Sequence, residues 1–169
     1  MRAPPTHPAA LAACAALCAC APSDAIVCSS GRMVGTSENA DMAPGQACIA
    51  CHAYSNAGGE GMEAPTFAFA GTVYATAHEP DGCAGGPVPP GGERAEIEVM
   101  SASGQRHVAP VGDGGNFMLE DATLVFPIRA TVRFQGRSRE MVQPQITGEC
   151  NLCHTAEGAE GAPGRIQLP

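Results

Sequence analysis

Four of the nine cysteines fall into two pentapeptides of the same pattern, in which a histidine follows the second cysteine. The first C-x-x-C-H motif comprises Cys48, Cys51 and His52, and the second comprises Cys150, Cys153 and His154. This spacing is the attachment signature of covalent c-type haem. Two thiols three residues apart can reach both vinyl groups of one porphyrin, while the adjacent imidazole binds the iron from the proximal side. The motifs therefore predict two covalent haem groups in each chain.

The same cysteines could serve three other kinds of chemistry, and the sequence argues against each of them. A thioredoxin-like C-x-x-C motif requires a βαβ pattern around it, which the sequence lacks. A zinc site made of two such pairs usually spaces them by about 15 to 20 residues, whereas about a hundred residues intervene here. Two structural disulfide bonds leave the histidine after each pair unexplained.

The histidines make a second set of candidates, because two haem irons have four axial positions. His7 lies in the N-terminal leader, so four histidines remain in the mature chain. His78 and His107 are the candidates for the positions opposite the motif histidines, although single histidines more often face solvent. A thioether also binds haem iron, so Met141 is an alternative axial ligand. His78 lies in a turn-like stretch, whereas His107 is expected within a strand.

The first 19 residues have the features of an export leader. Arg2 supplies a positive charge, and residues 9–19 form an apolar stretch of signal-peptide length that is too short to span a membrane. A small-residue cleavage site exists at 19–21, but residues 17–20 resemble a bacterial lipobox, in which Cys20 becomes the lipidated N-terminus. We favour lipidation, because a cut that places Cys20 first explains the cysteines clustered in the leader. Either cut predicts an exported chain, periplasmic or anchored by lipid to the outer membrane or cell surface.

Two cysteines of the predicted mature chain, Cys28 and Cys83, remain once the motifs and the lipid site are assigned. Compartments outside the cytoplasm permit disulfide bonds, so the sequence predicts that this pair is linked. The alternative is a pair of free buried thiols.

The composition indicates that aliphatic side chains alone do not complete the core. Leu, Ile, Val and Phe account for 27 of 169 residues, Trp is absent, and the net charge is −8. Such a composition would ordinarily indicate disorder, so we expect the haem groups to replace part of the core. The acidic excess argues against a nucleic-acid-binding protein, which needs a basic footprint.

The hydrophobic pattern predicts a mainly β protein, namely a small antiparallel β-sandwich flanked by irregular haem-binding segments. Expected strands cover residues 69–75, 96–99, 105–111, 116–119, 128–134 and 141–146, with a hairpin turn at 112–115. Several short strands at this spacing are typical of a sandwich. The predicted organisation is a leader at 1–19, an irregular segment with the first motif at 20–65, the sandwich at 66–147, and the second motif with a tail at 148–169.

Short stretches of the central region resemble the carboxypeptidase regulatory-like, or transthyretin-like, β-sandwich. They are a G-x-V at the first strand, the alternating strand at 95–99, the G-x-F at 115–117 and the late strand at 130–132 before Gly136. With a haem motif on either side, the chain resembles an exported dihaem c-type cytochrome, and residues 77–83, 148–155 and 161–166 are similar to bacterial cytochrome-like lipoproteins. Soluble cytochromes c are helical with one haem, so their fold is not implied.

The resemblance implies electron transfer but specifies no partner. We expect an electron carrier at the cell envelope whose partners are other redox proteins, cytochromes among them. Further copies of the chain could also stack haem against haem. One alternative is a haem-stabilised binding or structural module. Another is a dihaem peroxidase, which requires a five-coordinate haem with distal acid–base residues, and no such set stands out in the sequence. We therefore predict that the chain is not an enzyme.

Overall fold

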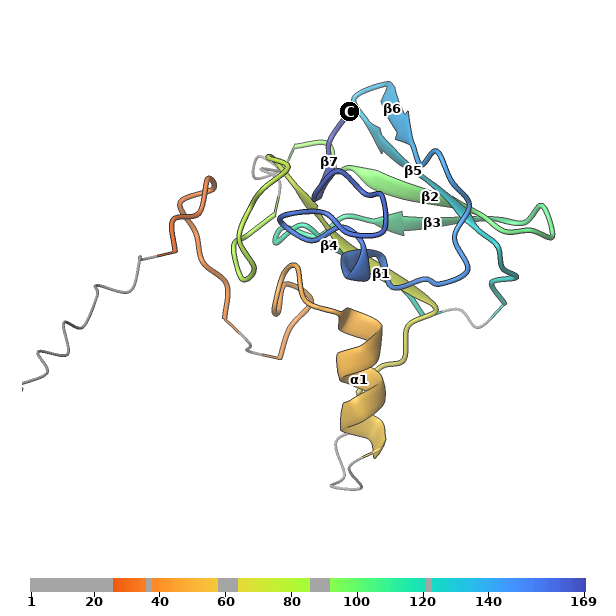
Figure 1. Cartoon of the computed structure of the whole chain (residues 1–169), viewed down its shortest axis with the longest axis horizontal. Helices are drawn as coiled ribbons and strands as arrows, with labels where there is room; N and C mark the ends of the chain where they lie inside the picture. The colour runs from red at the N-terminus through yellow and green to blue at the C-terminus, as the bar shows by residue number, and fades with distance from the viewer. Residues whose placement is uncertain (1–25, 36–37, 58–63, 86–91, 121–122) are drawn as a thin grey trace, which may run out of the picture.

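The computed structural model describes residues 26–35, 38–57, 64–85, 92–120 and 123–169. The predicted leader and the predicted lipidation site at Cys20 lie outside these residues. The elements are α1 (Cys48–Ala57), β1 (Phe69–Tyr74), β2 (Glu96–Met100), β3 (Arg106–Pro110), β4 (Asn116–Leu119), β5 (Arg129–Phe134), β6 (Arg137–Glu140), the 3-10 helix η1 (Cys150–Leu152) and β7 (Ile166–Gln167) (Figure 1). Among the described helices, none has the length and apolar character needed to cross a membrane.

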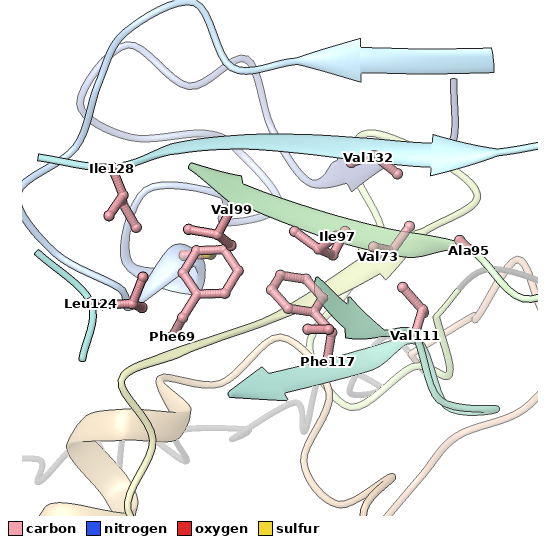
Figure 2. Packing of buried hydrophobic residues seen from close by; sticks show 12 residues of the cluster. Phe69, Val73, Ala95, Ile97, Val99, Val111, Phe117, Leu124, Ile128 and Val132 are labelled. Carbon is pink, nitrogen blue, oxygen red and sulfur yellow. The ribbon is translucent and has the colours of Figure 1, made fainter. Parts of the chain in front are cut away.

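The chain is mainly β, as predicted, and its strands form two sheets. The three-stranded sheet has the order β4-β1-β7, and the four-stranded sheet has the order β3-β2-β5-β6. Alternate residues of both sheets meet in one hydrophobic core (Figure 2). Phe69 and Phe117 come from the three-stranded sheet, and Ile97, Val99 and Val132 come from the other.

Strand β1 is buried along its whole length, although only one of its faces packs in the core. Phe69 and Val73 belong to the hydrophobic cluster. Thr72 and Tyr74 alternate with them and therefore point to the outer face of the sheet. Other segments of the chain cover this outer face, and these segments carry the candidate site.

The hairpin predicted at 112–115 is wrong, because the strands on either side of it lie in different sheets. β3 belongs to the four-stranded sheet and β4 to the three-stranded sheet, so the turn crosses between the two layers. Gly115 has a φ of 91°, and a Cβ at this position would lie 2.4 Å from the carbonyl oxygen of Val73. The glycines therefore permit a close backbone crossing rather than a tight hairpin.

The strand predicted at 141–146 is also wrong. The last strand of the four-stranded sheet is β6, which begins three residues after the end of β5. Gln135 and Gly136 have φ values of 50° and 72°, the conformation of a two-residue hairpin turn. All four side chains of β6 are exposed, so this edge strand lacks the apolar alternation on which the prediction relied. Residues 141–146 contribute an isolated bridge between Ile128 and Gln145 and a hydrogen bond from the Met141 amide to the Ala130 carbonyl oxygen.

The C-terminal segment adds a strand to the three-stranded sheet. β7 pairs in parallel with the end of β1, where Val73 lies opposite Ile166. Nearer the start of β1, Ala70 forms a parallel bridge with Glu149. The edge of β1 therefore holds both ends of the segment that contains the second motif.

Cys28 and Cys83 form a disulfide bond with a Cα–Cα distance of 5.3 Å and a sequence separation of 55 residues. Cys83 is buried, so the bond ties the N-terminal segment to the body of the fold. We expect the double variant Cys28→Ser/Cys83→Ser to lose about 2–4 kcal/mol of unfolding free energy, because the open chain gains freedom when unfolded. Chemical denaturation measures the loss, and peptide mapping without reduction should recover the linked pair. Recovery of both as alkylated thiols contradicts this prediction.

Candidate functional site

The two C-x-x-C-H motifs lie side by side, although about a hundred residues separate them in the sequence. The first motif forms the first turns of α1, and the second lies on η1 and the turn that follows it. Both α1 and η1 pack against β1, and η1 lies next to the N-terminal end of α1 (Figure 1). One region of the molecule therefore contains all six motif residues.

Glu149, immediately before the second motif, caps the helix of the first. Its Oε2 accepts hydrogen bonds from the backbone amides of Ile49, at 2.6 Å, and Ala50, at 3.1 Å. The first amides of a helix have no hydrogen-bond partner within the helix. A carboxylate accepts their hydrogen bonds, and its negative charge interacts favourably with the positive end of the helix dipole. Burial raises the pKa of the Glu149 carboxyl, although these amide donors oppose the effect.

Asn151, between the two cysteines of the second motif, holds the chain that leads into the first. Its Nδ2 donates to the carbonyl oxygen of Gln46, at 2.8 Å, and to Oγ1 of Thr72, at 3.2 Å. Its Oδ1 accepts from the Thr72 amide at 3.1 Å. The same Nδ2 lies 4.0 Å from Sγ of Cys48. The side chain is almost fully buried, so these bonds are made away from water.

A second asparagine extends this buried network across the outer face of the sheet. Asn116 accepts a 2.8 Å hydrogen bond from Oγ1 of Thr72, its neighbour across the β1–β4 pair. Its Nδ2 donates to the carbonyl oxygens of Ala40 and Met42. Thr72 Oγ1 also accepts from the Gly45 amide at 2.9 Å. The irregular segment before α1 is therefore fixed to the sheet by hydrogen bonds, and its Pro44 is fully buried.

Three histidines share one hydrogen-bonding arrangement, in which Nδ1 lies beside a backbone carbonyl oxygen. The pairs are His52 with Pro65 at 2.8 Å, His154 with Gly164 at 2.8 Å, and His78 with Ala156 at 2.6 Å. A carbonyl oxygen only accepts hydrogen bonds, so Nδ1 carries a proton in each ring, and the neutral imidazole then has its lone pair on Nε2. Metal-binding histidines are usually held in this way, because the second hydrogen bond sets the tautomer and orients the ring.

The cysteines of the motifs differ in exposure. Cys51 is exposed, Cys48 and Cys153 are half-buried, and Cys150 is buried in the edge of the core. Burial, and then the nearby Glu149 carboxylate, raises the pKa of the Cys48 thiol to about 11. Burial also raises the pKa of Cys150 well above its ordinary value. Neither group is a ready thiolate, which is the form that exchanges disulfides.

The fold brings the two cysteine pairs close together, so their separation in the sequence no longer argues against a zinc site. The positions of the ligand atoms argue against it instead. Among the described residues, the one group of three ligand atoms within 4.8 Å of one another is Cys28, Glu79 and Cys83. The disulfide bond uses both sulfurs of that group, so it is not a metal site as it stands. In the described part of the chain, the motif cysteines do not form a comparable group, although they belong to neighbouring elements.

Arg165 joins the loop that carries His78 to the turn that carries His154. Its backbone amide donates to the Ala77 carbonyl oxygen and its Nε to that of Glu79, both at 2.8 Å. One terminal nitrogen donates to the His154 carbonyl oxygen at 3.2 Å. The side chain is 1% exposed, forms an ion pair with Asp81 and lies 4.9 Å above the ring of Tyr74. His78 is therefore held beside the second motif.

His107 and Met141 lie elsewhere. His107 is on β3 opposite Val99, a core residue, so its ring points to the inside of the sandwich, and its Nε2 is buried. Met141 follows β6, and its amide donates to the Ala130 carbonyl oxygen of β5. His107 lies in the four-stranded sheet and Met141 directly follows its edge strand, whereas the motifs pack against β1. Of the three candidates for a distal ligand, the fold brings only His78 to a motif.

Three side chains of this site were not identified from the sequence: Glu149, Asn151 and Arg165. Each is at least nine-tenths buried, and each bonds to backbone groups of distant segments. A weak signal existed for Arg165, since it is the only charged residue after Glu160. For Glu149 and Asn151 the sequence held no signal, because their partners become neighbours only in the fold.

The residues present fit covalent haem. The four motif cysteines stay outside disulfide bonds, and both motif histidines keep Nε2 for a metal. Comparison of the chain with protein-family models, with curated proteins and with solved structures finds no match. The functional assignment therefore rests on the chemistry of these residues.

Proposed function

We propose that the chain is a dihaem c-type cytochrome that carries electrons at the cell envelope. The observation that carries the proposal is that both motifs combine cysteines outside disulfide bonds with a histidine locked in the iron-binding tautomer. The residues that would hold the groups are Cys48, Cys51 and His52 for the first, and Cys150, Cys153 and His154 for the second. The bound haems supply one-electron chemistry, and the protein supplies attachment, axial ligands and burial.

The interlocked motifs support electron transfer rather than haem binding alone. Glu149 and Asn151 hold the two motifs in one fixed arrangement through buried hydrogen bonds. The carbonyl oxygens of Pro65 and Gly164 hold the motif imidazoles in one orientation. A rigid, preorganised polar environment needs little rearrangement when the charge of a bound group changes.

The fold and export predictions are part of the same proposal. We propose that the two sheets are a sandwich of the carboxypeptidase regulatory-like type, and that Cys20 carries a lipid anchor. The small aliphatic content supports bound haem, because the porphyrins would bury apolar surface that the chain itself does not supply. His78 offers a sixth ligand beside the second motif, which favours a carrier role over a catalytic one at that haem.

Electron exchange with a redox partner tests this function. We expect the haem-loaded protein to be reduced and reoxidised reversibly, with two electrons per chain, and to exchange electrons with a basic cytochrome in a second-order reaction. Anaerobic redox titration and stopped-flow absorbance measure these properties. The variant Cys150→Ser/Cys153→Ser, which keeps the first motif, should take up one electron. Absence of exchange with any redox partner contradicts the carrier role, and sustained turnover of peroxide assigns the chain to the peroxidases.

A further inference from the structure

Backbone carbonyl groups of the segment 154–165 hold two imidazole rings, those of His154 and His78. His154 and His78 each have Nδ1 fixed to a carbonyl oxygen of this segment, those of Gly164 and Ala156 respectively. Both rings therefore keep Nε2 for a metal, and both are positioned by the same short stretch of backbone. His52, by contrast, is positioned by Pro65, in a different segment.

Arg165 connects the segment 154–165 to the loop that carries His78. Its guanidinium donates to the carbonyl oxygens of Glu79, the residue after His78, and of His154, and its backbone amide donates to that of Ala77, the residue before His78. A buried guanidinium with several acceptors in a fixed fork is a rigid connection, because moving any one segment leaves a charged donor without a partner. The position of His78 relative to His154 is therefore set by Arg165.

We propose that His78 and His154 are the two axial ligands of the haem attached at Cys150 and Cys153, and that Arg165 is the positioning residue for His78. This assignment rests on the proposed function, and it adds which haem His78 serves. It leaves the first haem, with His52, independent of His78. Arg165 does not touch the iron; it acts by holding the loop 77–81 against the turn after the second motif.

Single-haem proteins test the assignment of His78. Cys48→Ser/Cys51→Ser keeps the second haem, and Cys150→Ser/Cys153→Ser keeps the first. In the Cys48→Ser/Cys51→Ser protein, we expect His78→Ala to convert the remaining second haem from low spin to high spin, with exogenous imidazole restoring the low-spin spectrum. The same substitution should leave the spectrum of the other protein unchanged. His78 is exposed, so the substitution should leave the fold intact. Conversion of the first haem to high spin by His78→Ala, or no conversion in either protein, overturns the assignment.

Arginine variants test the positioning role in the protein that keeps the second haem. We expect Arg165→Gln to shift the ligation equilibrium of His78 by about tenfold towards high spin, reversed by imidazole, with Arg165→Lys restoring part of it. Arg139→Gln is the matched control, because Arg139 is exposed and contacts the same C-terminal tail at Gln167. Equal spectra for the two Gln variants overturn the role of Arg165. Chains that carry no haem at all contradict the proposed function itself, so the two failures are distinguishable.

Discussion

Protein matured by an export pathway that attaches haem should carry two covalent haem groups, and each motif should account for one of them. Intact mass spectrometry should show two haem additions, and a denaturing gel stained for haem should show that the groups are covalent. The physical reason is the pairing of thiols three residues apart with an adjacent imidazole, twice in one chain. An intact mass with no haem added contradicts the whole functional reading.

Cysteine variants assign the two additions to the two motifs. Cys51→Ser should reduce attachment at the first motif alone, and Cys153→Ser at the second alone, since each porphyrin uses only its own pair of thiols. The matched control is Cys28→Ser/Cys83→Ser, which removes two cysteines that are joined to each other. That control should keep both haem additions, whereas loss of a haem from it would mean that the motif assignment is wrong.

Asn151→Ala should lower the unfolding free energy by about 3 kcal/mol and weaken the first haem site, although the substitution lies in the second motif. The buried amide of Thr72 and the carbonyl of Gln46 both lose their partner on Asn151. Leaving the buried Thr72 amide unsatisfied costs about 1–3 kcal/mol, and the bond lost by the carbonyl of the exposed Gln46 adds about 0.5–1.5 kcal/mol. Chemical denaturation followed by circular dichroism measures the loss of stability.

The effect on the first site can be read separately. Because the side chain holds the backbone just before Cys48, we expect the Soret spectrum of the first haem to change in the Cys150→Ser/Cys153→Ser background. Gln143→Ala is the control, since Gln143 is exposed and surface substitutions usually change stability by less than about 0.5 kcal/mol. If Asn151→Ala behaves like this control, the two motifs are not coupled through Asn151.

The sequence was sufficient to predict those features that depend on residues close together in the chain. The C-x-x-C-H spacing defines its chemistry within five residues, because attachment requires only two thiols and an imidazole at fixed separations. Strands with one buried face, such as β2 and β5, were predicted from alternation within two or three residues, since the two faces of a strand alternate. The link between Cys28 and Cys83 followed from eliminating the other cysteines, and the structure contains that bond.

Only the tertiary structure decided how these parts meet. A parallel strand from the C-terminal tail pairs with β1, and this long-range pairing places η1 beside α1, so that Glu149 caps a helix a hundred residues away. The choice between His78 and His107 likewise depends on strand register, because the pairing of His107 with Val99 turns that ring inward. Exposed β6 and the layer-crossing turn at 112–115 were missed for the same reason. Pairing partners and buried polar networks are set by contacts between distant segments, and a linear pattern does not record those contacts.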